Sequence, residues 1–174
     1  MSDVLYNATI QARVSAPDGT ETLDLKPASE APPSGVSSWP NLKFSVVSWS
    51  QARGYHLVDA FDLITSSADP QQGLSQVTLS NGKKLVCNPD TVLPLLRHRT
   101  LDPRVYDGCI RARDLKAGDS LIGCDFDQLT KTTPSEVKVV KVKPKSPEDG
   151  GTLTSFNTSG QVPVGVSGVL LYPY

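Results

Sequence analysis

The chain has 174 residues, of which 38% are hydrophobic and 20% charged, so it is long and apolar enough for one domain with a buried core. Its net charge is −1 and its pI about 6.1, so no basic field exists for a phosphate backbone and we expect no nucleic-acid partner. No apolar run approaches the roughly 20 residues of a membrane-spanning helix, so we expect no membrane partner. The 13 glycines and 14 prolines favour short strands joined by turns, which predicts an all-β protein.

The first forty residues have the pattern of a separate arm. Residues 4–13 alternate weakly between apolar and polar side chains, Asp18-Gly19 marks a turn, and residues 20–25 predict a returning strand, which together form a hairpin. Residues 27–40 contain several prolines and serines and have the composition of a semi-extended linker. The arm either docks on another chain or folds onto its own domain, and the sequence leaves both open.

We therefore divide the chain into an N-terminal arm with its linker, residues 1–40, and a main β domain, residues 41–174. The first residues, Met1-Ser2-Asp3, lack the basic and apolar regions of a signal peptide. We expect the protein to stay in the cytoplasm in which it is synthesised.

Apolar alternation in the main domain predicts many short antiparallel strands. Residues 55–66 are apolar but ambiguous between helix and strand, and residues 111–119 predict a short helical turn that ends at Gly118. A phase change at Val139-Val140 indicates a β-bulge. Strands are expected over residues 42–49, 121–124, 136–143, 152–156 and 162–172.

Residues 74–88 carry the clearest signal in the chain. Alternating apolar residues flank Asn81-Gly82, which is the strongest short-range signal for a β-hairpin. We expect both turn residues to adopt positive φ.

The three cysteines, Cys87, Cys109 and Cys124, are widely spaced and form no CxxC pair. With only two histidines, His56 and His98, they do not predict a zinc site, and we expect small packing residues, with no metal and no cofactor. His98, between two arginines, is expected in a solvated turn.

Two further clusters of charge are interpreted in the same way. Asp125 and Asp127 share a strand face but have no third ligand, so we expect a solvated turn and not a cation site. The lysines of the strand over residues 136–143 and just beyond it predict a solvent face or a guarded sheet edge. These are Lys138, Lys141, Lys143 and Lys145.

Three segments, in order, resemble the Hint (hedgehog/intein) domain superfamily. Residues 79–92, Leu-Ser-Asn-Gly-Lys-Lys-Leu-Val-Cys-Asn-Pro-Asp-Thr-Val, resemble the intein hairpin that leads into a Thr-x-x-His motif. Residues 106–121 resemble the next segment, with its Ala-x-x-Leu-x-x-Gly-Asp run, and residues 167–173 resemble the closing strand, which in inteins ends in His-Asn. The resemblance covers roughly residues 74–173 and implies a Hint-like β fold.

The chemistry of that family requires particular groups at these positions. A cysteine or serine at the amino end of the domain attacks a peptide carbonyl, the histidine of Thr-x-x-His protonates the scissile amide, and a terminal asparagine cyclises. Thr-x-x-His falls on the residues from Asn88 to Thr91, which puts a hydroxyl in place of the imidazole, and His-Asn falls on Tyr172 and Pro173. Proline has no side-chain amide to cyclise. The resemblance therefore implies a degenerate Hint domain without splicing chemistry.

We expect a non-catalytic structural or assembly protein that docks onto other protein subunits. By analogy with free-standing degenerate domains, the setting is a phage tail or baseplate, with incorporation into a virion. Aromatic side chains are the candidate interface residues, because they carry much contact energy at low entropic cost. They are Trp39, Trp49, Tyr172 and Tyr174.

Two other hypotheses remain. One is a cleavage-only autoprocessing domain that uses a cysteine, with His98 as base; it predicts a low-pKa thiol. The other is a small binding module unrelated to Hint domains that recognises a peptide or a glycan. The Hint interpretation requires residues 74–92 to lie beside residues 162–173, and the unrelated module does not.

Overall fold

The computed structural model describes residues 5–6, 13–15, 22–24, 37–39, 44–67, 71, 73–129, 131–147 and 152–174. The protein is built from antiparallel strands, as expected. The strands are β1 (Leu5–Tyr6), β2 (Arg13–Ser15), β3 (Thr22–Asp24), β4 (Ser37–Trp39), β5 (Phe44–Ser50), β6 (Gly54–Ser67), β7 (Leu74–Leu79), β8 (Lys84–Cys87), β9 (Val92–Arg97), β10 (Cys109–Arg111), β11 (Ser120–Gly123), β12 (Ser135–Lys145), β13 (Thr152–Thr158), β14 (Val164–Val166) and β15 (Val169–Leu171). The described residues also contain three short 3₁₀ turns, η2 (Ala112–Asp114), η3 (Phe126–Gln128) and η4 (Ser159–Gln161).

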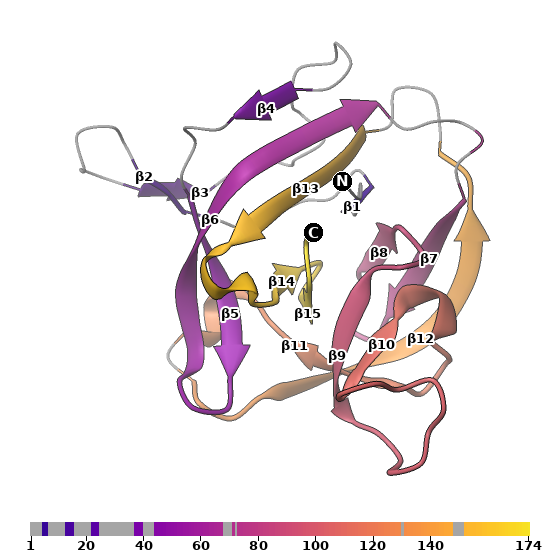
Figure 1. Cartoon of the computed structure of the whole chain (residues 1–174). Helices are drawn as coiled ribbons and strands as arrows, with labels where there is room; N and C mark the ends of the chain where they lie inside the picture. The colour runs from indigo at the N-terminus through magenta and orange to yellow at the C-terminus, as the bar shows by residue number, and fades with distance from the viewer. Residues whose placement is uncertain are drawn as a thin grey trace.

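The strands join into one strongly bent sheet in the order β10-β9-β11-β12-β7-β8-β1-β13-β6-β5-β2-β3. In addition, β4 pairs with β6, and β15 pairs with both β11 and β14. Figure 1 shows β5, β6 and β13 on one side and β7 to β12 on the other, with the β14–β15 hairpin in the middle. Four residues of this hairpin, Val164, Val166, Val169 and Leu171, belong to the largest core cluster of the described residues, and Val164, Val169 and Leu171 are fully buried.

The ambiguous segment, residues 55–66, is a strand. Over 14 residues β6 pairs with β5 and then β4 along one edge and with β13 along the other. Pairing on both edges favours the extended form, because backbone N–H and C=O groups on either side then find partners. Tertiary pairing therefore decides what local propensity left open.

Strand β1 lies in the centre of the sheet. Leu5 pairs with Cys87 of β8 and Thr154 of β13, and its side chain is completely buried. A hairpin forms around the expected turn, since β2 pairs with β3, but its first strand is Arg13–Ser15 and not residues 4–13; the Asp18-Gly19 turn itself lies outside the described residues. The described parts of the first forty residues thus pack on their own domain, while the boundary at residue 40 stays a prediction.

The β7–β8 hairpin forms as expected, but its turn differs. Only Gly82 has positive φ, +84°, and Asn81 does not. The Gly82 amide donates to the Leu79 carbonyl, and the Asn81 side chain accepts from the Lys83 amide and donates to the Ser167 carbonyl at 3.1 Å. The Asn81 side chain therefore ties the hairpin to a distant turn. In that turn, between β14 and β15, Ser167 and Gly168 both have positive φ.

Strand β12 contains the expected bulge, because its register against β7 shifts between Val139 and Lys141. It pairs with β11 over residues 135–138 and with β7 over residues 139–145, so the segment with Lys141 and Lys143 has a described strand partner on one edge only, and the expected solvent face or guarded edge stays an interpretation. Lys138, Lys141 and Lys143 are exposed, as a solvent face requires.

Several boundaries differ from the expected ones. Residues 162–172 form two strands and a turn instead of one strand, because Ser167-Gly168 reverses the chain. Residues 111–119 contain the single 3₁₀ turn η2, and Gly118 has φ +93°. The strands β9 and β10 were not expected, since Pro94 interrupts the pattern of β9 and β10 has only three residues.

Replacing Leu5 by alanine tests whether β1 belongs to the core in solution. The completely buried side chain of Leu5 should make Leu5→Ala cost about 2–5 kcal/mol of unfolding free energy. Leu101→Ala is the matched control, because Leu101 is 92% exposed and the same deletion should leave stability within about 0.5 kcal/mol. Urea unfolding followed by circular dichroism measures both. Equal stability of the two variants would contradict the central place of β1.

Candidate functional site

Thr91 lies at the end of a tight turn after β8. The Thr91 amide donates to the Asn88 carbonyl at 3.0 Å, and the Asn88 side chain accepts from the Asp90 amide at 2.8 Å. The Thr91 carbonyl accepts from Ala112 at 2.8 Å. The turn buries the Thr91 side chain, of which 5% is exposed.

The carboxyl end of the chain crosses this turn. The Tyr172 amide donates to the carbonyl of Val92, next to Thr91, at 3.0 Å. One residue later, the Pro173 carbonyl accepts from the Phe156 amide of β13 at 3.1 Å. Residues 74–92 and 162–173 are therefore neighbours, as the Hint interpretation requires. The four positions on which the resemblance places the family motifs lie in one region of the molecule; they are Asn88, Thr91, Tyr172 and Pro173.

The side chains in this region offer little to a proton-transfer or acyl-transfer reaction. The buried Thr91 hydroxyl has no hydrogen-bond partner of good geometry; its neighbour is the Cys87 thiol, which is a weak donor. Burial raises the pKa of Cys87 to about 12, and the Thr91 contact offsets only part of that rise. Cys87 is therefore a neutral thiol at physiological pH.

The other two cysteines are free as well and are not activated. Burial raises the pKa of Cys124 to about 12. The pKa of Cys109 is raised by partial burial and by the nearby Asp107 carboxylate, and a hydrogen bond with the Tyr172 hydroxyl opposes the rise. A nucleophilic cysteine needs a lowered pKa, and all three shifts go the other way.

Neither histidine is placed as a base for these thiols in the described part of the chain. His98 is exposed and its Nδ1 contacts the Arg99 carbonyl at 3.2 Å, while His56 Nδ1 contacts the Gly54 carbonyl at 2.9 Å. Among the described residues, no group of three or more histidine, cysteine, aspartate or glutamate side chains could hold a metal ion. Asp125 pairs with Lys83 at 3.7 Å.

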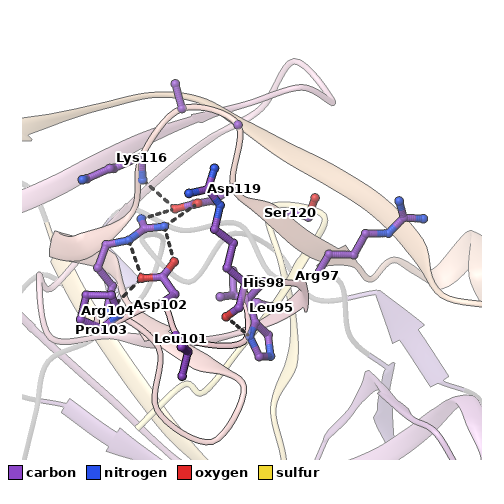
Figure 2. Close-up of a pocket in the computed structure, with 13 residues that line it drawn as sticks. Leu95, Arg97, His98, Leu101, Asp102, Pro103, Arg104, Lys116, Asp119 and Ser120 are labelled. Carbon is purple, nitrogen blue, oxygen red and sulfur yellow. Dashed lines mark hydrogen bonds and ion pairs between the residues drawn. The ribbon is translucent and has the colours of Figure 1, made fainter.

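A network of hydrogen bonds and ion pairs around Arg104 anchors the segment before β10. The sequence pattern did not predict this network. Arg104 lies between two carboxylates (Figure 2): it donates to Asp102 from Nε and Nη2, and to Asp119 from Nη1 and Nη2, at 2.8–3.1 Å. Nη1 also donates to the Asp114 carbonyl at 2.9 Å. These carboxylates raise the pKa of Arg104, whereas Arg104 lowers the pKa of Asp102. The network fixes residues 98–108 to the rest of the molecule and borders a cavity of about 700 Å³.

A second cavity, of about 820 Å³, opens on the other side of Arg104. We call it the tyrosine cavity, because Tyr106, Tyr172 and Tyr174 line it, together with the three residues of β10. Tyr172 and Tyr174 make an edge-to-face contact with ring centroids 5.9 Å apart. Two of the four expected interface residues thus lie together.

The two tryptophans lie elsewhere. Trp49 is half-buried against a smaller core cluster, and its indole N–H donates to the Thr132 carbonyl at 3.3 Å. Trp39 is in β4, paired with Leu63 of β6. Tyr106 was not among the interface candidates expected from the sequence. Its position beside the Asp107-Gly108 turn could have indicated that its side chain is exposed.

No helix among the described residues has the length and apolarity to cross a membrane. No protein-family model and no curated protein match the sequence. Comparison of the structure with solved structures, in contrast, returns inteins.

An intein from a hyperthermophile superposes with a TM-score of 0.63 over 96% of this chain and 99% of its own, at 17% sequence identity. The PabCDC21-1 intein gives 0.64 over 97% and 99% at 14% identity, and a DnaB intein from Synechocystis sp. PCC 6803 gives 0.60 over 97% and 99% at 7% identity. The fold is an intein-like Hint fold. The likeness covers 96% of this chain or more, which exceeds the stretch over which the motifs resembled the family.

Removing Arg104 tests the anchoring role of its network. Arg104→Ala should lower the unfolding free energy by roughly 1–3 kcal/mol, because it leaves partly buried acceptors without donors. Arg97→Ala is the matched control: its side chain is 78% exposed and makes one ion pair of 3.7 Å, so it should cost little. Urea denaturation of the two variants measures the difference. Equal losses would show that the network does not contribute.

Because the thiols of Cys87 and Cys124 are buried, we expect the folded protein to lose stability at alkaline pH. A thiol titrates at 9.0 without burial and at about 12 in Cys87 and Cys124. Between these values the unfolded chain binds fewer protons than the folded one, so stability should fall by up to about 1.4 kcal/mol per pH unit for each thiol. Urea midpoints from pH 8 to 11 measure the slope, which Cys87→Ala with Cys124→Ala should flatten. Rapid labelling of either thiol in the folded protein at pH 8 would contradict the argument.

Proposed function

We propose that the protein is a non-catalytic structural or assembly protein that uses an intein-like scaffold to dock onto partner subunits. The observation that carries the proposal is the chemistry of the region where Thr91 meets the chain end. Thr91 lacks a basic nitrogen, and Pro173 lacks the amide that would cyclise. The backbone hydrogen bonds around Thr91 and Tyr172 are formed, which supports a folded scaffold in which the resemblance implies that reactive groups are replaced.

The raised pKa values of the cysteines support the same proposal. An autoprocessing alternative would use one of these thiols as nucleophile, and Cys109 is the most accessible of the three. Its pKa is raised, and no histidine contact among the described residues would deprotonate it. No observation therefore favours the alternative over docking.

The proposed partners are protein subunits of a larger assembly, and the proposed setting is a phage tail or baseplate, from cytoplasmic synthesis to incorporation into a virion. A net charge of −1 speaks against nucleic acid as the partner. The setting rests on analogy between degenerate Hint domains and not on any residue of this chain.

Intact-mass spectrometry tests whether the chain processes itself. After long incubation with excess thiol or with hydroxylamine, which cleave thioesters and esters, we expect one species at the sequence mass of 18.6 kDa. Cys109→Ala is the matched control and should give the same spectrum as the unchanged protein. A thiol-dependent fragment that disappears in Cys109→Ala would overturn the proposal and identify the nucleophile.

A further inference from the structure

Two large apolar side chains are displayed on a segment that is held rigidly. Leu101 is 92% and Tyr106 83% exposed. Between them, Arg104 bonds to Asp102 and Asp119, and just after Tyr106 the chain reverses at Asp107-Gly108 with positive φ at both residues. A fixed backbone that presents exposed aromatic surface is typical of binding sites, because little entropy is lost when a partner is bound.

Tyr106 forms one wall of the tyrosine cavity, and the chain end forms the other. Tyr174 is 37% exposed, and its hydroxyl donates to the Gln161 carbonyl. Tyr172 is held by its backbone bond to Val92 and by the edge-to-face contact with Tyr174. The aromatic walls are therefore formed before any ligand arrives.

Both cations of the tyrosine cavity are engaged by carboxylates. Arg104 pairs with Asp102 and Asp119, and Arg111 pairs with Asp114 at 3.4 Å. The cavity therefore keeps the Asp107 carboxylate and has no unengaged cation among its lining residues, so its charge disfavours a ligand with acidic side chains.

A partner peptide is not expected to bind here by adding a strand to β10. β10 has three residues, and the Cys109 amide and carbonyl are both bonded to Tyr106 at 2.9 Å. An added strand needs a row of free backbone groups. A polyproline II peptide needs none, because it docks on aromatic walls. The Tyr174 hydroxyl already donates to Gln161 and the Tyr172 hydroxyl bonds with Cys109, so the exposed Tyr106 hydroxyl is the donor for a peptide carbonyl.

We propose that the tyrosine cavity binds a proline-rich extended peptide of a partner protein that carries no acidic side chains. The proposal rests on the proposed docking function and names the surface and the class of partner. Tyr106 is its main anchor, because it is the most exposed of the three rings and stands on the anchored segment.

Titration of ¹⁵N-labelled protein with a blocked twelve-residue peptide of repeated Ala-Pro-Pro tests this. We expect amide shifts confined to residues 104–111 and 172–174, which flank the cavity. Tyr106→Ala should weaken binding at least about tenfold without loss of folding, because its ring is exposed. Val140→Ala is the control: Val140 is also an exposed apolar residue, 54%, but lies on β12 outside the cavity, and should bind normally.

Three outcomes would overturn the proposal: no shifts, equal affinity of the Tyr106→Ala variant, or shifts of these residues by cellohexaose and not by the peptide. The last would assign the cavity to a glycan. A failed titration with an unchanged intact mass would remove this site and leave the docking function, whereas a thiol-dependent fragment would remove the docking function itself.

Discussion

Two backbone hydrogen bonds hold the carboxyl end of the chain, and much of the molecule depends on them. The Tyr172 amide donates to the carbonyl of Val92, the first residue of β9, and the Pro173 carbonyl accepts from the Phe156 amide of β13. These partners belong to opposite sides of the bent sheet (Figure 1), so the chain end joins the two. The same bonds place Tyr172 beside Cys109 and form one wall of the tyrosine cavity.

Backbone hydrogen bonds fix the geometry of this region. Thr91 bonds to Asn88 and Ala112, and Tyr172 bonds to Val92, through backbone amides and carbonyls that are present whatever the side chain. The arrangement of the region therefore does not depend on reactive side chains. The buried thiols nearby are protonated, since their pKa values are raised and not lowered. An intein-like fold thus carries no necessary activity, because activity depends on the groups placed in it.

The Arg104 network plays a comparable part on the outer surface. Its hydrogen bonds to Asp102 and Asp119 hold a long excursion between β9 and β10 that would otherwise be free to move. One consequence is that Tyr106 stays exposed at a defined place beside the chain end. The rigidity of the excursion and the burial of the chain end together define the tyrosine cavity.

The sequence by itself determined the fold class, the β7–β8 hairpin and the bulge in β12, because each follows from neighbouring residues: turn chemistry at Asn81-Gly82, alternation in the flanking strands, and a phase change at Val139-Val140. The order of three short motifs also indicated the intein-like fold. Only the tertiary structure decided the rest. The turn at Asn81 takes a different form from the expected one because its side chain bonds to Ser167, 86 residues away. Strand β1 is central because Cys87 and Thr154 flank it, and Arg104 is an anchor because folding brings Asp119 to it. Each of these contacts joins residues far apart in the chain, and local pattern carries no information about such pairs.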